Sequence, residues 1–119
     1  MNTKSLGNEG ESRVCDYITG LGMKVLDRNF RFGKEEIDII ALDKDTYVFI
    51  EVKTRSGRLH GSPFDAVTPF KQKAIVRAAV GYIKTKNLFN KSIRFDVAGV
   101  EFDSIKYIKN AFDATGYGV

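Results

Sequence analysis

Apolar residues recur at helical spacing in two parts of the chain. The first part runs from about Ser5 to Leu21 and predicts a helix that ends at the glycines on either side of Leu21. In the second part, Thr68 and Pro69 form a favourable N-cap and first helical residue, and the pattern continues to about Lys86. We therefore expect one helix near the N-terminus and one in the second half of the chain.

Between and after these helices, apolar and polar residues alternate with the period of a β-strand. The segments that do so span residues 23–32, 37–41, 47–55 and 92–102, and residues 105–108 form a further candidate strand. A turn at Gly33 and Lys34 follows the first segment, and Asp43 to Thr46 form a turn between the second and third. Residues 56–68 hold two glycines and a proline without a sustained period, which predicts a long loop.

This order of elements, αβββαβ with one further candidate strand, favours an α/β fold in which helices flank both faces of a mixed sheet. No repeat or linker divides the sequence, and 119 residues are close to the usual size of one domain. Residues 1–119 are therefore expected to form a single domain. The tail after about residue 112 is expected to be flexible.

The composition excludes several kinds of site. The chain has one cysteine, Cys15, and one histidine, His60. A single thiol cannot form an internal disulfide, and no thiol cluster or histidine pair is present for a zinc or two-histidine iron site. The N-terminus lacks the apolar region of a signal peptide, and no run approaches about 20 apolar residues. We therefore expect a cytoplasmic protein without a membrane segment.

Charge is distributed unevenly along the sequence. The formal net charge is only +4, yet eleven of the fifteen acidic residues lie in residues 1–65, whereas residues 66–95 contain seven basic residues and no acid. Ordinary solvated helix faces would explain this pattern, and so would a nucleic-acid partner. In the second case, the phosphate contacts would come from the basic half and the loop before it, through Arg55, Arg58, Lys71, Lys73 and Arg77.

The register of the predicted hairpin carries the main chemical prediction. If Asp43 to Thr46 form its turn, Asp38 lies opposite Glu51. By the same count, Glu36 lies opposite Lys53. Side chains opposed across two strands project from one face with their Cβ atoms about 4.5–5.5 Å apart, so the carboxylates of Asp38 and Glu51 would converge. The apolar neighbours indicate an interior strand, where such a pair needs a cation.

Two kinds of cation fit this pair. Lys53 lies two residues after Glu51 and on the same face of the strand, so its ammonium group can approach both carboxylates. Alternatively, two carboxylates and a backbone carbonyl are hard oxygen ligands of the type that Mg²⁺ or Mn²⁺ accepts. The remaining interpretation is a purely structural salt-bridge network that comprises Glu36, Asp38, Glu51 and Lys53.

Two further polar residues lie on the apolar stripes of the predicted helices. Glu11 shares the buried stripe of the first helix. At this position Glu11 is either the partner of Asn8 in a capping box or a third metal ligand, which binds the metal directly or through water. Gln72 lies in the apolar arc of the second helix, where it either faces the site or satisfies a backbone group.

Five motifs cover nearly the whole chain: GNEGE at 7–11, EEIDIIA at 35–41, VFIEVKTR at 48–55, AVTPFKQKAI at 66–75 and IRFDVAGV at 93–100. In this order they resemble the YraN-like family of the PD-(D/E)xK nuclease superfamily, which is similar in fold to archaeal Holliday-junction resolvases. The sequence departs from the pattern at two positions. Ile37 replaces the proline of the superfamily motif, and Glu35 stands where the family often has a second glycine, which could alter how DNA enters.

The resemblance implies a restriction-endonuclease-like αβββαβ core and a metal-dependent endonuclease that hydrolyses phosphodiester bonds in DNA, such as branched DNA in repair or recombination. It implies that Asp38 and Glu51 hold Mg²⁺ or Mn²⁺, that Val52 lends its carbonyl, and that Lys53 activates the attacking water. Glu11 would occupy the helix-one acid of resolvase-type sites. Gln72 would be the polar residue that such nucleases carry on the second helix.

A junction substrate would suit a homodimer, in which two sites meet two strands. The alternative function is a non-catalytic nucleic-acid-binding module that retains the nuclease fold.

Overall fold

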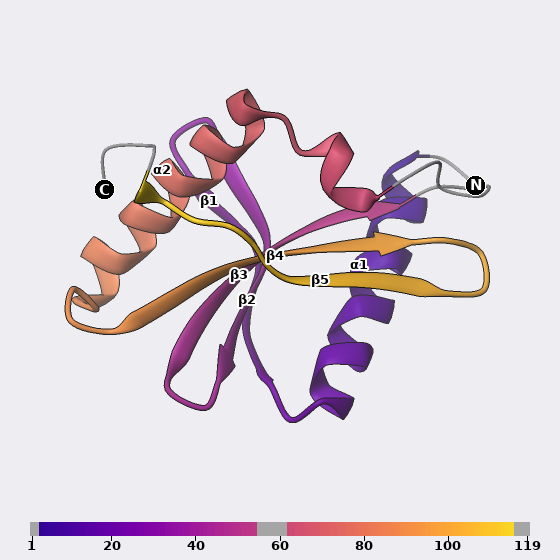
Figure 1. The fold of residues 1–119 in the computed structure, drawn as a ribbon, viewed down its shortest axis with the longest axis horizontal. Coiled ribbons are helices and arrows are strands. Elements are labelled where there is room, and N and C mark those ends of the chain that lie inside the picture. Colours follow the sequence, from indigo (N-terminus) through magenta and orange to yellow (C-terminus); the bar gives the residue numbers. More distant parts are fainter. Residues whose placement is uncertain (1–2, 55–61, 116–119) are drawn as a thin grey trace.

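The computed structural model describes residues 3–54 and 62–115. Its helices are α1 (Thr3–Gly20) and α2 (Pro69–Lys86), and a short 3-10 helix, η1 (Pro63–Ala66), precedes α2. The strands are β1 (Lys24–Phe32), β2 (Glu35–Asp43), β3 (Thr46–Thr54), β4 (Ser92–Val100) and β5 (Ile105–Phe112). The two helices lie on opposite sides of a twisted sheet (Figure 1). The predicted α/β fold is therefore confirmed.

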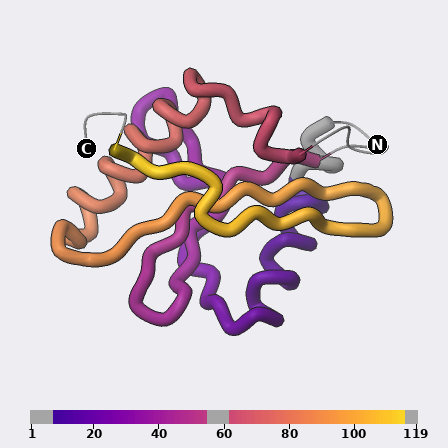
Figure 2. Tube along the Cα trace, viewed as in Figure 1, coloured from indigo at the N-terminus to yellow at the C-terminus, as the bar shows by residue number. Residues whose placement is uncertain are grey.

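The five strands form one sheet in the order β1-β2-β3-β4-β5. Strands β3 and β4 are parallel, and the other neighbouring pairs are antiparallel, so the sheet is mixed as expected. The connection between β3 and β4 contains α2, which packs on β1 and β2. The last strand is longer than the predicted segment and pairs with β4, in a hairpin that reaches one end of the molecule (Figure 2).

The core has two layers, one on each face of the sheet. The layer under α1 is built around Val14 and Ile18 of that helix, which pack with Ile39 and Ile50. The layer under α2 contains their neighbours along the same strands, such as Ile40 and Phe49, together with the apolar arc of the helix. This separation follows from the period of two along a strand, which sends successive side chains to opposite faces.

Local sequence signals explain where α2 begins and ends. The hydroxyl of Thr68 accepts a hydrogen bond from the backbone N–H of Lys71, and Pro69 occupies the first turn. Asn87 ends the helix in the left-handed conformation, with a φ of 56°. Neither helix in the described part of the chain is long and apolar enough to cross a membrane.

The N-terminal helix corrects one alternative from the sequence. Helix α1 begins at Thr3, so Asn8 lies inside the helix and does not cap it. The capping box with Glu11 is therefore wrong, because an N-cap residue must stand at the boundary with non-helical backbone. The predictions for Arg55, Arg58, His60 and the last four residues of the tail lie outside the described residues.

Candidate active site

Strands β2 and β3 pair in the predicted register, from Asp43 opposite Thr46 to Ile39 opposite Ile50. Because Asp43 and Thr46 are themselves paired, the turn has two residues between the strands rather than the expected four. The described ladder ends at Ile39, so the pairs predicted beyond it are not ladder pairs. Instead, the backbone N–H of Val52 donates to Oδ2 of Asp38 at 2.8 Å. The side chain of Asp38 therefore occupies the point where the strands separate.

The carboxyl groups of Asp38 and Glu51 nevertheless meet, as the register predicted. They are close enough to share a hydrogen bond, although they come from different strands. Glu51 is only 4% exposed, and its Oε2 lies 3.3 Å from the Nζ of Lys71 in the first turn of α2. The structure thus brings together two acidic side chains and one lysine under the N-terminal end of α2.

This pairing changes the ionisation of Asp38. Burial and the adjacent Glu51 raise the pKa of Asp38 to about 8, against the opposing effects of the Val52 N–H and the Lys71 charge. At neutral pH the carboxyl group of Asp38 is therefore mostly protonated. The proton is retained because too little positive charge lies beside the two acids. Such a pair is suited to a divalent cation, which would displace the proton.

Glu11 lies near this pair but has partners of its own. It is 9% exposed, and the amide nitrogen of Asn29 donates to both of its carboxylate oxygens, at 3.0 and 3.2 Å. Nη2 of Arg28 lies 3.6 Å from Oε1 of Glu11. The same Asn29 nitrogen donates to Glu36 at 3.1 Å. Burial raises the pKa of Glu11, the Asn29 hydrogen bond opposes this, and the charge of Asp38 adds to it.

Glycine at position 10 sets how closely α1 approaches the sheet at this point. A Cβ atom built on Gly10 would lie 2.1 Å from Oγ1 of Thr54, at the end of β3. Any larger residue would therefore have to displace the Thr54 side chain or move α1, which carries the neighbouring Glu11. The space beside Gly10 is filled by the side chain of Thr54.

The predicted metal ligands gather only in part. Asp38 and Glu51 are adjacent, but no group of three histidine, cysteine, aspartate or glutamate side chains that could hold a metal occurs among residues 3–54 and 62–115. The donors that fit a hard cation are therefore the two carboxylates, and the backbone of Val52 lies at the same point. Glu11 remains a predicted ligand that this geometry does not bring into the group.

Lys53 has different surroundings from those expected, and Gln72 matches one of its two interpretations. Lys53 shares the face of Glu51 on β3, yet within the described chain Glu51 pairs with Lys71 and Lys53 has no ion pair. Gln72 is buried, and its Nε2 donates to the carbonyl of Val67 at 3.0 Å. It therefore satisfies a backbone group, which was one of its two interpretations.

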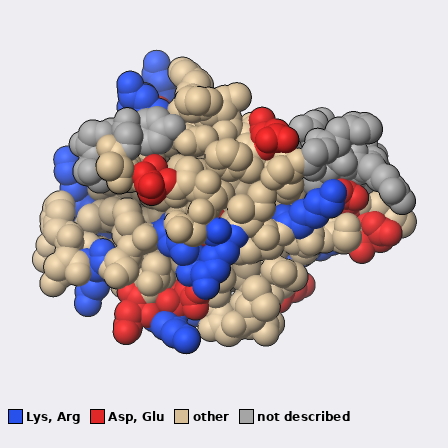
Figure 3. All heavy atoms as spheres, viewed as in Figure 1, with Lys and Arg blue, Asp and Glu red and all other residues tan. Residues whose placement is uncertain are grey.

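Three of the five predicted phosphate-binding residues are described by the structure, and these three, Lys71, Lys73 and Arg77, lie on α2. Lys71 faces Glu51, whereas Arg77 lies 3.6 Å from Glu35 at the start of β2. The extra acid that departs from the family pattern thus has a basic partner. On the face shown in Figure 3, basic and acidic side chains are interspersed rather than gathered in one basic surface.

Sequence reasoning missed two parts of the site. Asn29 joins Glu11 and Glu36, and its left-handed backbone, with a φ of 53°, allows it to do so. An asparagine within a predicted strand is a weak signal of this conformation, because asparagine tolerates it better than most residues. Lys71 was expected to contact phosphate, and only the packing of α2 on the sheet places it on Glu51.

Comparison with solved structures supports the fold. The Holliday junction resolvase Hjc of Archaeoglobus fulgidus superposes with a TM-score of 0.50 over 90% of this chain and 79% of the resolvase chain. The two sequences are 18% identical, so this likeness concerns the fold alone. It agrees with the resolvase-like, restriction-endonuclease-like core that the motifs implied.

Comparison with other sequences gives the family. The profile of the "Uncharacterised protein family UPF0102" matches residues 10–100. A UPF0102 protein of Clostridium botulinum (strain Loch Maree / Type A3) is 48% identical, with 92% of this chain and 94% of the relative covered. A UPF0102 protein of Geotalea daltonii is 43% identical, with 94% and 92% covered. The resemblance to the YraN-like family is confirmed, and the chain belongs to the family UPF0102.

Proposed function

We propose that this chain is a metal-dependent endonuclease that hydrolyses phosphodiester bonds in DNA. The observation that carries the proposal is the contact between the Asp38 and Glu51 carboxyl groups, which have Lys71 as their cationic neighbour. Burying two acids side by side is unfavourable unless a cation joins them. The nuclease-like fold of the resolvase neighbour supports this assignment.

Asp38 and Glu51 would hold Mg²⁺ or Mn²⁺, with the carbonyl of Val52 as a further oxygen donor. The chemistry that such an ion supplies is polarisation of a phosphate oxygen and a lower pKa for a bound water. The residues of the chain contribute positive charge around it. Lys53 and Lys71 would stabilise the negative charge that develops on the phosphate in the transition state.

The direct test measures cleavage of branched, nicked and flapped DNA with and without Mg²⁺ or Mn²⁺. Asp38→Asn and Glu51→Gln should each lower the cleavage rate by at least about 100-fold, since each removes a charged ligand. Asp45→Asn is the matched control, because Asp45 is an exposed acid in the turn between β2 and β3. Equal rates for the wild type and the two site variants would reject the proposal.

The basic residues Lys73 and Arg77 on α2 would also suit a second candidate, a nucleic-acid-binding module that does not cleave. This function predicts salt-dependent binding without turnover. Removing the charges of Lys73 and Arg77 would then weaken binding, and Asp38→Asn would have little effect. Cleavage that depends on Asp38 would exclude this candidate.

A branched substrate would favour a homodimer, since a two-fold axis places two sites on two strands. We propose this assembly, and a cytoplasmic role in DNA repair or recombination, as part of the same assignment. Sedimentation with and without a four-way junction tests the assembly. A monomer on the junction would contradict it.

A further inference from the structure

A separate pocket lies between α2 and the turn that joins β1 to β2. Its volume is about 410 Å³, near the lower end of the roughly 300–1,000 Å³ usual for small-ligand sites. Phe32 lines it from the end of β1, Gly33 lines it from the turn, and Val76 and Val80 line it from the helix. This volume suits one compact ligand rather than a folded chain or a duplex.

Part of the pocket lining is apolar and contains an aromatic ring. Phe32 is 48% exposed, and its ring lies directly against α2 at Gly81. A Cβ atom built on Gly81 would stand 2.4 Å from that ring, so only glycine allows the ring to lie there. The ring is therefore held against the helix while part of it stays accessible. Val76 and Val80 continue the apolar part of the lining.

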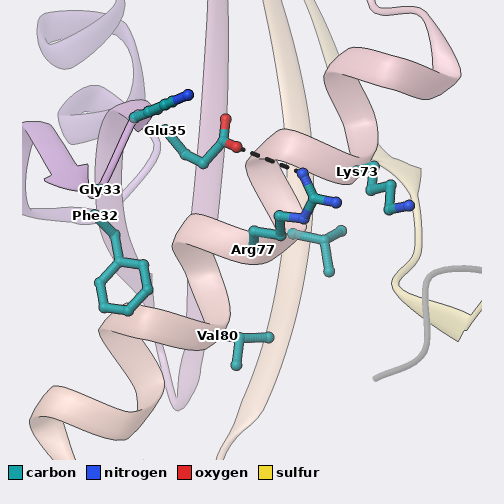
Figure 4. Close-up of a pocket in the computed structure, with 8 residues that line it drawn as sticks. Phe32, Gly33, Glu35, Lys73, Arg77 and Val80 are labelled. Carbon is teal, nitrogen blue, oxygen red and sulfur yellow. Dashed lines mark ion pairs between the residues drawn. The ribbon is translucent and has the colours of Figure 1, made fainter.

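Three of the residues that line the pocket are basic. Lys34 lines it from the turn, and Lys73 and Arg77 line it from α2. The single acid in the lining, Glu35, lies 3.6 Å from Arg77, which leaves the charge of two lysines without an acidic partner in the pocket. Figure 4 shows Phe32 and Val80 toward one end of the pocket, Lys73 toward the other, and Arg77 between them.

We propose that this pocket binds one unpaired nucleotide. An apolar lining with an aromatic ring suits a flat base, because base–aromatic stacking does not depend on base identity. The adjacent cations suit the phosphate attached to that base. A base within a duplex is stacked and paired and cannot enter a pocket of this size, so the nucleotide must be unpaired or free.

The pocket also has a defined place relative to the carboxyl pair. Glu35 in its lining precedes Asp38 by three residues on β2, which corresponds to about 10 Å of strand. Stacked nucleotides advance about 3.4 Å each, so the bound nucleotide would lie within about three nucleotides of the carboxyl pair. This step rests on the proposed function: the preferred substrate would carry an unpaired nucleotide close to the cleaved bond.

The test measures binding without cleavage, by fluorescence anisotropy in EDTA. Three probes are compared: a blunt duplex, the same duplex with one bulged nucleotide, and a free nucleoside monophosphate. Wild type should bind the bulged duplex at least about 10-fold more tightly than the blunt one. Tight binding of the monophosphate in place of the bulge would identify a free nucleotide as the ligand.

Variants connect that preference to the pocket. Val80→Phe should fill the apolar part of the pocket and Phe32→Leu should remove the aromatic face, and each should abolish most of the preference. Lys73→Glu should weaken binding of the bulged duplex. Lys84→Glu, on the same helix but outside the pocket, is the matched control. Circular dichroism and melting temperature establish that each variant is folded.

Equal binding of all three probes by wild type, or a preference that survives both Val80→Phe and Phe32→Leu, would overturn the inference. Asp38→Asn should keep the preference, because Asp38 does not line the pocket. If the protein proved not to cleave DNA at all, the binding preference for the bulged duplex would therefore be unaffected. If the pocket proved not to bind an unpaired nucleotide, the result of the cleavage experiment would likewise be unaffected.

Discussion

Two buried acidic sites on the sheet differ in how their charge is balanced. Asp96 of β4 is 1% exposed and accepts hydrogen bonds from the Arg94 side chain, the Tyr107 hydroxyl and the Asn110 backbone. Asp38 and Glu51 have one backbone N–H, one lysine and each other. The first carboxylate is fully compensated by this chain, whereas the second pair is not.

The pKa values of the partners support this contrast. Burial would lower the pKa of Arg94, but its hydrogen bonds to Asp96 and Asp43 raise it above the ordinary value. Burial and Asp96 both raise the pKa of Tyr107, so the hydroxyl remains a donor. At Asp38, burial and the adjacent Glu51 outweigh the Val52 N–H and the Lys71 charge, so this carboxyl group keeps its proton. A complete network indicates a structural role, whereas the incomplete one is the place where we propose that a cation binds.

The largest expected effect is on the complete network. Arg94→Met would leave Asp96 buried without its bidentate partner, which should lower the free energy of unfolding by about 3–5 kcal/mol. Urea denaturation measures this change. Arg31→Met is the matched control, because Arg31 is 72% exposed in its pair with Glu36 and should cost at most about 1 kcal/mol. Equal costs would contradict the structural role of Asp96.

The next largest effect is a gain in the free energy of unfolding rather than a loss. Asp38→Asn should stabilise the protein by on the order of 2 kcal/mol at pH 8, because it removes one of two adjacent acids and keeps an oxygen for the Val52 N–H. The gain should vanish near pH 4. Urea denaturation across this range measures it, with Asp45→Asn as the control. A loss of stability at pH 8 would mean that the ionised pair is structural.

The sign of this pH dependence follows from the raised pKa of Asp38. Between its unfolded pKa near 3.8 and its folded pKa of about 8, the folded chain holds a proton that the unfolded chain has released. Stability contributed by this proton is therefore present at low pH and is lost as the pH rises toward 8. The Asn variant has no such proton, so its stability should be flatter over this window.

A divalent ion should act on the same pair with a smaller effect. Millimolar Mn²⁺ is expected to raise the melting temperature of wild type by a few degrees at pH 8, equivalent to about 1 kcal/mol. The increase should be smaller at pH 5, because the proton on Asp38 competes with the ion. Glu51→Gln should remove it and Asp45→Asn should not. Equal shifts in all three proteins would show binding elsewhere.

Much of this comparison could be predicted from the sequence. Alternation along residues 37–41 and 47–55 and a short turn fixed the register, and the register placed Asp38 beside Glu51. The α/β order and the two-faced sheet followed from the same periods. These features depend on local patterns, which a sequence carries directly.

The partners of the acids could not be predicted in the same way. Lys71 reaches Glu51 across a helix–sheet contact, and Asn29 reaches Glu11 because its backbone is left-handed. The network of Asp96 joins β4, β5 and the end of β2, which no spacing indicates. Such contacts depend on how elements pack, so the sequence located the acids without revealing which of them were compensated.

The smallest effect sharpens the comparison at Lys71. Lys71→Gln should lower the free energy of unfolding by only about 0.5–1 kcal/mol, because this lysine is 41% exposed and the proton on Asp38 limits the charge of the pair. Lys73→Gln, two residues along the same helix, should have no effect on this pair. Urea denaturation at pH 8 measures both, with and without Mn²⁺. If an ion replaces the lysine as the cation of the pair, Mn²⁺ should reduce the difference between Lys71→Gln and wild type; a difference that grows with Mn²⁺ would mean that Lys71 itself helps to hold the ion-binding geometry.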